Sequence, residues 1–249
     1  ASAAATSYQS TKLVYTVSWG NILLAKSHLD YQFGEDDARI SASVDSDGFI
    51  AFFSSFQSRA NADLVLKDAG WTPKTLFMER VSGRKTLQSR VAWDDDSNVS
   101  TESRMPELDL GKVYPLTAQM LVNVLDPYSA VLRLIRHIET TSECTESYEI
   151  YDGRRRNRLH FKTLGTTNLT ETRPGEFVGN ALICSLKFEP IGGHQIDSKW
   201  RSGEKDDDDR IKMFFGRPLQ GQIVPVRVEV DSWIGTVVGR LDLRKMTVQ

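Results

Sequence analysis

The chain has 249 residues, a formal net charge of −2 and an apolar fraction of 40%. This composition is typical of a folded globular protein and argues against wholesale disorder. The near-neutral charge disfavours nucleic acid or an anionic membrane as the main partner. No stretch approaches the roughly 18 apolar residues that a membrane helix needs.

The first residues, Ala-Ser-Ala-Ala-Ala-Thr-Ser, are small and polar. They match what remains after a signal peptide is removed at an Ala-x-Ala-like site. A flexible cytosolic terminus or a truncated chain gives the same pattern. We expect residues 1–10 to be a flexible mature N-terminus and residues 11–249 to form a single β-barrel-like domain of an exported, periplasmic protein.

Alternation of apolar residues with period two predicts strands through the first part of the chain. The predicted strands are 12–19, 29–33, 39–44, 62–66, 73–80 and 87–93. Residues 49–56 are nearly all apolar or small and fit either a buried strand or one helical turn. Asp45-Ser-Asp47-Gly48 and Asp68-Ala-Gly70 are turn signals, and the second suits a hairpin.

The middle of the chain changes character. Residues 102–116 contain Pro106, Gly111 and Pro115 and predict an irregular crossover, and residues 117–125 are a candidate helix. Asp126-Pro127 is a helix start, because Asp caps free amides and Pro at the first helical position loses no hydrogen bond. An apolar stripe then predicts a second, amphipathic helix over about 128–139. The stripe consists of Val131, Leu134, Ile135 and Ile138.

Strands resume after this helix. They are predicted at 146–151, 158–164, 181–188, 224–230 and 237–243, with an uncertain strand near 168–172. Residues 199–210 look the least structured. Ten or more strands around a central helical segment predict a mainly β fold, in which a sheet this large curls to protect its edges. We expect an open or spiral β-barrel with one or two helices, one of them covering an opening.

Two cysteines lie on the apolar side of predicted strands. Cys144 shares its parity with Tyr148 and Ile150, and Cys184 shares its parity with Leu182 and Leu186. Residues two apart point to one face of a strand, so both thiols should face the same interior. A Cys144–Cys184 disulfide would place the protein in an oxidising compartment. The alternative is two separate buried thiols.

No motif predicts an enzyme. The histidines form no metal-binding spacing, and the chain has no Gly-x-Ser-x-Gly, Ser-x-x-Lys or phosphate-cradling glycine loop. The acidic clusters at 45–47 and 94–96 do not fit a calcium loop, and the run at 206–209 is typical of a solvated, self-repelling loop. We expect no catalytic residue, no cofactor and no metal.

A compact cluster of arginines follows the turn signal Asp152-Gly153. It consists of Arg154, Arg155, Arg156 and Arg158. Such a cluster suits phosphate or carboxylate groups. The alternative is a solvated turn that balances nearby acids such as Glu146 and Glu149.

Several motifs occur in an order that resembles a known family. They are Tyr15-Thr-Val-Ser-Trp19-Gly20, Asp126-Pro-Tyr-Ser-Ala130, Cys144, Tyr151-Asp-Gly-Arg-Arg155 and Cys184. Together they resemble a bacterial periplasmic family catalogued as a domain of unknown function, number three-one-zero-eight. The resemblance spans nearly the whole chain. It implies an exported β-rich domain, similar in fold to envelope-integrity and lipoprotein-carrier β-barrel proteins, and it brings no catalytic residues.

The leading hypothesis is therefore a non-enzymatic periplasmic protein that supports envelope integrity by binding a lipid-like ligand or an envelope protein. Aromatic residues are candidates for lining a β-lined concavity, although each also fits plain core packing. They are Trp19, Tyr31, Phe33, Phe53 and Trp93. The alternative is an interaction scaffold without a ligand, and an unrecognised hydrolase is the weakest reading.

Overall fold

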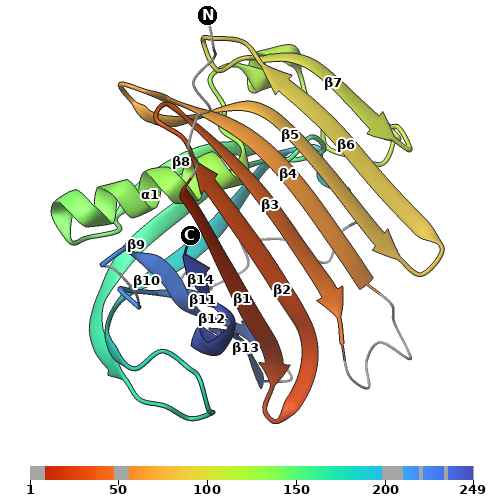
Figure 1. Ribbon diagram of the computed structural model, residues 1–249. Helices are drawn as coiled ribbons and strands as arrows, with labels where there is room; N and C mark the ends of the chain where they lie inside the picture. Colours follow the sequence, from red (N-terminus) through yellow and green to blue (C-terminus); the bar gives the residue numbers. More distant parts are fainter. Residues whose placement is uncertain (1–8, 48–55, 198–209, 219–220, 233–234, 249) are drawn as a thin grey trace, which may run out of the picture.

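The computed structural model describes residues 9–47, 56–197, 210–218, 221–232 and 235–248. Within these ranges one 14-stranded sheet dominates the molecule, and a helix lies across one end of it (Figure 1). The strands of the N-terminal half are β1 (Gln9–Trp19), β2 (Ile22–Phe33), β3 (Asp37–Ser46), β4 (Phe56–Lys67), β5 (Gly70–Ser82), β6 (Lys85–Trp93) and β7 (Val99–Met105). Those of the C-terminal half are β8 (Glu146–Tyr151), β9 (Arg156–Leu169), β10 (Gly179–Gly192), β11 (Ile211–Gly216), β12 (Val224–Ser232), β13 (Gly235–Leu241) and β14 (Thr247–Val248).

The sheet is an antiparallel meander that curls without closing. Its order is β7-β6-β5-β4-β3-β2-β1-β13-β12-β11-β10-β9-β8, with β14 added beside β1. Almost every strand pairs with its neighbour in sequence, and the pairing of β1 with β13 joins the two halves through Tyr15 and Leu241. The strands β7 and β8 are left as the two edges. The prediction of a mainly β, open barrel-like fold is confirmed.

One end of the curled sheet is filled by large apolar side chains. The inner-face residues Leu13, Ile40, Leu64 and Leu76 are almost completely buried. They belong to one core cluster with Leu132 of the helix α1 (Pro127–Thr141), which covers this end. The burial of these side chains gives the sheet its main hydrophobic stabilisation.

The helix α1 begins where the sequence predicts. The Asp126 carboxylate accepts hydrogen bonds from the backbone N–H groups of Tyr128, at 2.8 Å, and of Ser129, and Pro127 occupies the first turn. The helix ends at Ser142, which adopts a left-handed conformation with φ of 61°. The earlier candidate at 117–125 contains only a short 3-10 helix, η2 (Ala118–Leu121).

The structure corrects three sequence-based assignments. Part of the segment 102–116, which was predicted to be irregular, belongs to the strand β7. The prediction missed this strand because four of its side chains are exposed and polar and give no apolar alternation. The strand β11 was missed because its apolar residues are consecutive rather than alternating. The strand β1 already includes Gln9 and Ser10, which were assigned to the N-terminal segment, and residues 49–55 lie outside the described residues.

The two cysteines meet under the helix. The sulfur atoms of Cys144 and Cys184 lie 2.08 Å apart, at disulfide-bonding distance, and both residues are fully buried in a second core cluster with Leu134 and Ile138. This pair ties the segment after α1 to β10 and is consistent with an oxidising compartment. In the described part of the chain, no helix is long and apolar enough to cross a membrane.

Candidate functional site

The two edges of the sheet are joined by side chains. The Tyr151 hydroxyl at the end of β8 donates a hydrogen bond to Glu102 of β7 at 2.6 Å and accepts one from Arg104 at 2.5 Å. Arg104 also donates through Nε to the carbonyl oxygen of Gly153 at 2.7 Å. Tyr151 is fully buried. Side chains therefore hold β7 and β8 together where no strand pairing is found among the described residues.

A short segment before α1 reinforces this seam, which is the junction between the edge strands β7 and β8. The N–H of Val124 donates to the carbonyl of Ser97, in the turn between β6 and β7, at 3.1 Å. Leu125 then bridges to β8: its N–H donates to the backbone carbonyl of Glu149, and its carbonyl accepts from the backbone N–H of Tyr151 at 2.8 Å. Residues 124–125 thus link the turn before the edge strand β7 to the other edge strand, β8.

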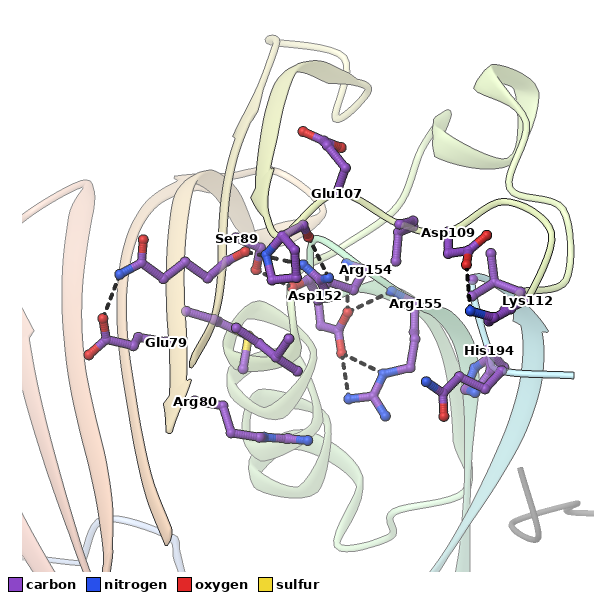
Figure 2. Close-up of a pocket in the computed structure, with 18 of the residues that line it drawn as sticks. Glu79, Arg80, Ser89, Glu107, Asp109, Lys112, Asp152, Arg154, Arg155 and His194 are labelled. Carbon is purple, nitrogen blue, oxygen red and sulfur yellow. Dashed lines mark hydrogen bonds and ion pairs between the residues drawn. The ribbon is translucent and has the colours of Figure 1, made fainter. Parts of the chain in front are cut away.

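A pocket of about 420 Å³ opens beside the seam (Figure 2). Its floor is the inner face of β4, β5 and β6, and its walls are the crossover after β7, the turn between β8 and β9, and the end of β10. The floor residues are Ser58, Met78, Arg80, Leu87 and Ser89. The wall residues are Pro106, Glu107, Leu108, Asp109, Lys112, Val113, Asp152, Arg154, Arg155, Gly193, His194 and Gln195, with Glu79 and Gln88 at the margin.

The turn between β8 and β9 is organised by Asp152. Its Oδ1 accepts hydrogen bonds from the backbone N–H groups of Arg154 at 2.9 Å and Arg155 at 2.7 Å, and its Oδ2 pairs with the Arg155 guanidinium at 3.1 Å. Gly153 adopts a φ of 86°, which favours glycine. Ser89 of β6 donates to the Asp152 carbonyl at 3.0 Å and so fixes the turn to the pocket floor. The turn predicted from Asp152-Gly153 is present.

Arg154 crosses the pocket wall. Its guanidinium donates to the backbone carbonyls of Gln88, at 3.3 Å, and Pro106, at 2.7 Å. Both acceptors are neutral, so these two hydrogen bonds do not neutralise the positive charge of Arg154. Burial lowers the pKa of Arg154, and the neighbouring charge of Arg104 lowers it further, while the charges of Asp152 and Glu107 oppose the shift.

Arg80 also lines the pocket, although it was not among the predicted binding residues. It shares the inner parity of β5 with Leu76 and Met78, and it pairs across the sheet with Ser58 and Leu87. Its guanidinium lies 5.8 Å from the ring centre of Phe56 and extends toward Arg155 across the pocket (Figure 2). An arginine on the apolar parity of a strand was the signal that could have revealed it.

His194 completes the wall. Its Nε2 is buried, and none of the described residues offers it a hydrogen-bond partner. Burial lowers the pKa of His194, and the charge of Arg155 lowers it further, while a hydrogen bond to the Arg156 backbone and the nearby Asp152 oppose the shift. The lowered pKa favours the neutral ring, in which only one of the two nitrogens carries a proton.

The predicted arginine cluster divides into two parts. Arg154 and Arg155 line the pocket, whereas Arg156 and Arg158 do not. Both of the latter pair with Glu149, and Arg158 also pairs with Glu189 at 3.2 Å. These two arginines belong to an ion-pair ladder across β8, β9 and β10.

None of the predicted aromatic residues that the structure describes lines the pocket. Tyr31 is buried and stacks on Phe33 with ring centres 6.0 Å apart, and Trp93 is buried in the same core. Trp19, at the end of β1, is 37% exposed. Phe53 lies outside the described residues. Tyr31 and Trp93 therefore serve packing.

The geometry defines a class: a curled antiparallel β-sheet protein with a polar, cation-rich pocket beside its open seam. A family model described as Protein of unknown function (DUF3108) matches residues 14–242, and the chain belongs to this family. None of the curated proteins compared with the chain matches it.

A solved structure shares the fold. The crystal structure of a β-barrel-like protein of domain of unknown function DUF1849 from Brucella abortus aligns with a TM-score of 0.53 and 10% sequence identity. The alignment covers 97% of this chain and 98% of that chain. At this identity the likeness shows the fold alone.

Proposed function

We propose that this protein is a non-enzymatic, exported protein of the periplasm that binds a lipid-like ligand in the seam pocket and thereby supports the cell envelope. The observation that carries the proposal is the lining of the pocket. Met78, Leu87 and Val113 supply apolar surface, while Arg80 and Arg155 supply charge. A pocket with both kinds of surface suits a ligand that has an apolar part and an anionic part.

The Cys144–Cys184 pair supports the exported location. A buried disulfide of this kind forms and persists in oxidising compartments and is rare in a reducing cytosol. The motifs around Tyr151 and the two cysteines, which resemble those of a periplasmic family, support the same exported location.

Native mass spectrometry of protein purified from its source tests the proposal. We expect a co-purified small molecule on the wild type and its loss in Ser58→Trp, because a large side chain on the inner face fills the pocket floor. Gln57→Trp is the matched control, since Gln57 is the neighbouring residue on β4 and is exposed on the opposite face. A wild-type protein that carries no small molecule under gentle ionisation contradicts the proposal.

A scaffold without a ligand is the second candidate function. It is favoured by exposed apolar side chains on the crossover and at its ends: Met105 is 66% exposed, Leu110 78% and Val122 52%. Exposed apolar groups of this kind mark protein contacts when they form one patch. In the same mass-spectrometry experiment, a stoichiometric protein partner in place of a small molecule supports the scaffold.

A further inference from the structure

We propose that Arg80 and Arg155 form a phosphate-binding subsite in the seam pocket, beside Arg154 and His194. This inference rests on the proposed function, because it names the chemical group that the same pocket recognises. It assigns the anionic part of the ligand to a specific place in the fold.

The first support is the state of Arg80. Its side chain lies on the inner face of the sheet and lines the pocket, and its guanidinium lies over the face of the Phe56 ring. No hydrogen bond or ion pair of its guanidinium is present within the described parts of the chain. Its N–H donors are thus half-buried, without a protein acceptor among the described residues, and available to water or to a ligand.

The second support is the repulsion among like charges. Burial, and then the charge of Arg155, disfavour the charged form of Arg80, and burial, and then the charge of Arg104, disfavour that of Arg154. Asp152 favours the charged forms of Arg80 and Arg154 and also pairs with Arg155, so this single carboxylate faces three guanidinium groups. A bound anion would relieve this repulsion.

The other acids of the pocket do not cancel these charges. Asp109 pairs with Lys112 at 2.9 Å, so these two charges neutralise each other at the rim. Glu79 accepts a hydrogen bond from Gln88 at 2.7 Å on the outer face of β5 and β6. Glu107 favours the charged form of Arg154, but it is exposed to solvent, which screens its charge. The deep part of the pocket therefore keeps an excess of positive charge.

The arrangement of donors favours phosphate over carboxylate. Arg80 approaches from the sheet floor, and Arg155 approaches from the turn on the opposite wall (Figure 2). A planar carboxylate is satisfied by one guanidinium fork, whereas a tetrahedral phosphate presents oxygens in several directions. Donors that approach from the floor and from a wall match the second geometry.

The phosphate has two possible sources, a lipid headgroup and free phosphate, and calorimetry at low salt separates them. The ligands are inorganic phosphate, dodecyl phosphate and dodecanoate. We expect dodecyl phosphate to bind more tightly than dodecanoate, which has the same chain length. Tighter binding of dodecyl phosphate than of inorganic phosphate indicates a lipid source, and equal binding indicates free phosphate.

Arg80→Gln should weaken dodecyl phosphate binding by about 10-fold or more, because it removes charged hydrogen bonds. Arg80→Lys should recover part of the affinity. Arg90→Gln is the matched control, since Arg90 also lies over a phenylalanine ring, 4.4 Å from the centre of Phe77, but on the outer face. The affinity of the Arg90→Gln variant for dodecyl phosphate should equal that of the wild type.

Two results overturn the inference. One is an Arg80→Gln affinity for dodecyl phosphate equal to that of the wild type. The other is a wild type that binds none of the phosphate ligands. If a natural small molecule still co-purifies in either case, the proposed function stands and only the phosphate assignment fails. If dodecyl phosphate binds with the expected losses but nothing co-purifies, the subsite stands without the proposed function.

Discussion

Tyr151 and Glu102 connect the two edges of the sheet through a hydrogen bond of 2.6 Å. They are far apart in the sequence, on β8 and β7, and the contact brings together the turn at Asp152 and the inner face of β6. The pocket wall that carries Arg154 and Arg155 is held in place by this contact. The seam between β7 and β8 is thus the place where the barrel stays open, and its side-chain contacts also support the candidate site.

Tyr151→Phe should lower the free energy of unfolding by about 1–2 kcal/mol, because a buried hydroxyl that bonds to charged groups is lost. Glu102 and Arg104 remain paired with each other, which limits the cost. Urea unfolding measures the change. Tyr114→Phe is the control, since Tyr114 is exposed, and it should stay within about 0.5 kcal/mol of the wild type. Equal stability of both variants would show that the seam hydrogen bonds contribute nothing.

Gly193→Ala should damage both stability and the pocket. Gly193 has a φ of 74°, and an added Cβ would collide with the carbonyl oxygen of Arg154 on the pocket wall. Gly221→Ala is the matched control, because Gly221 has a φ of 77° but open space around its Cβ position. We expect a loss of about 1–2 kcal/mol for Gly221→Ala from the left-handed backbone, and about 3 kcal/mol or more for Gly193→Ala.

Thermal and urea unfolding measure these two variants, and calorimetry with dodecyl phosphate measures the pocket. Gly193→Ala should also bind the ligand more weakly, while Gly221→Ala should bind normally. If the two variants are equally stable, the end of β10 does not approach the turn as closely as described.

The disulfide gives a prediction about composition and stability. Protein isolated from its source should contain no free thiol, and the pair closes a loop with a sequence separation of 40 residues. In the loop-entropy model, removing the bond by Cys144→Ala with Cys184→Ala costs about 4 kcal/mol. Mass spectrometry under non-reducing conditions counts the thiols, and urea unfolding measures the cost. Two alkylated cysteines in the native protein would contradict the pairing.

The free energy of unfolding should depend on pH through His194. Burial and the charge of Arg155 lower its pKa in the folded protein below the ordinary value of 6.5, while Asp152 opposes the shift. The unfolded chain therefore takes up the proton more readily. Stability is highest above about pH 6.5 and falls as the pH drops through that value, until the folded protein is protonated as well.

His194→Gln should flatten this part of the pH profile. Urea unfolding at several pH values between 7.5 and 5 measures both proteins. Saturating dodecyl phosphate should reduce the loss in the wild type, because an anion next to the ring favours its charged form. A wild-type profile identical to that of His194→Gln rules out a buried, neutral His194.

Much of the fold follows from the sequence, because period-two alternation and turn residues act locally. The helix start at Asp126-Pro127 and the hairpin at Asp68–Gly70 are examples. The strand β7 was missed because an edge strand at the seam carries polar side chains. Local patterns cannot show which two strands become the edges of a curled sheet.

The site was predicted only in part for the same reason. Arg154 and Arg155 stand out as a run, but their separation from Arg156 and Arg158 depends on ion pairs with Glu149 and Glu189 across three strands. Arg80 is brought to the pocket by the pairing of β4, β5 and β6. Such contacts between distant segments follow from the tertiary structure.

The most direct test of the seam pocket as an anion site is NMR of the arginine side chains. On addition of dodecyl phosphate, the Nε–Hε resonances of Arg80 and Arg155 should shift, because the phosphate accepts hydrogen bonds from their guanidinium groups. The resonances of Arg90 and Arg158, outside the pocket, should stay in place. Shifts confined to arginines outside the pocket, or no shift of Arg80 at saturation, would contradict the account.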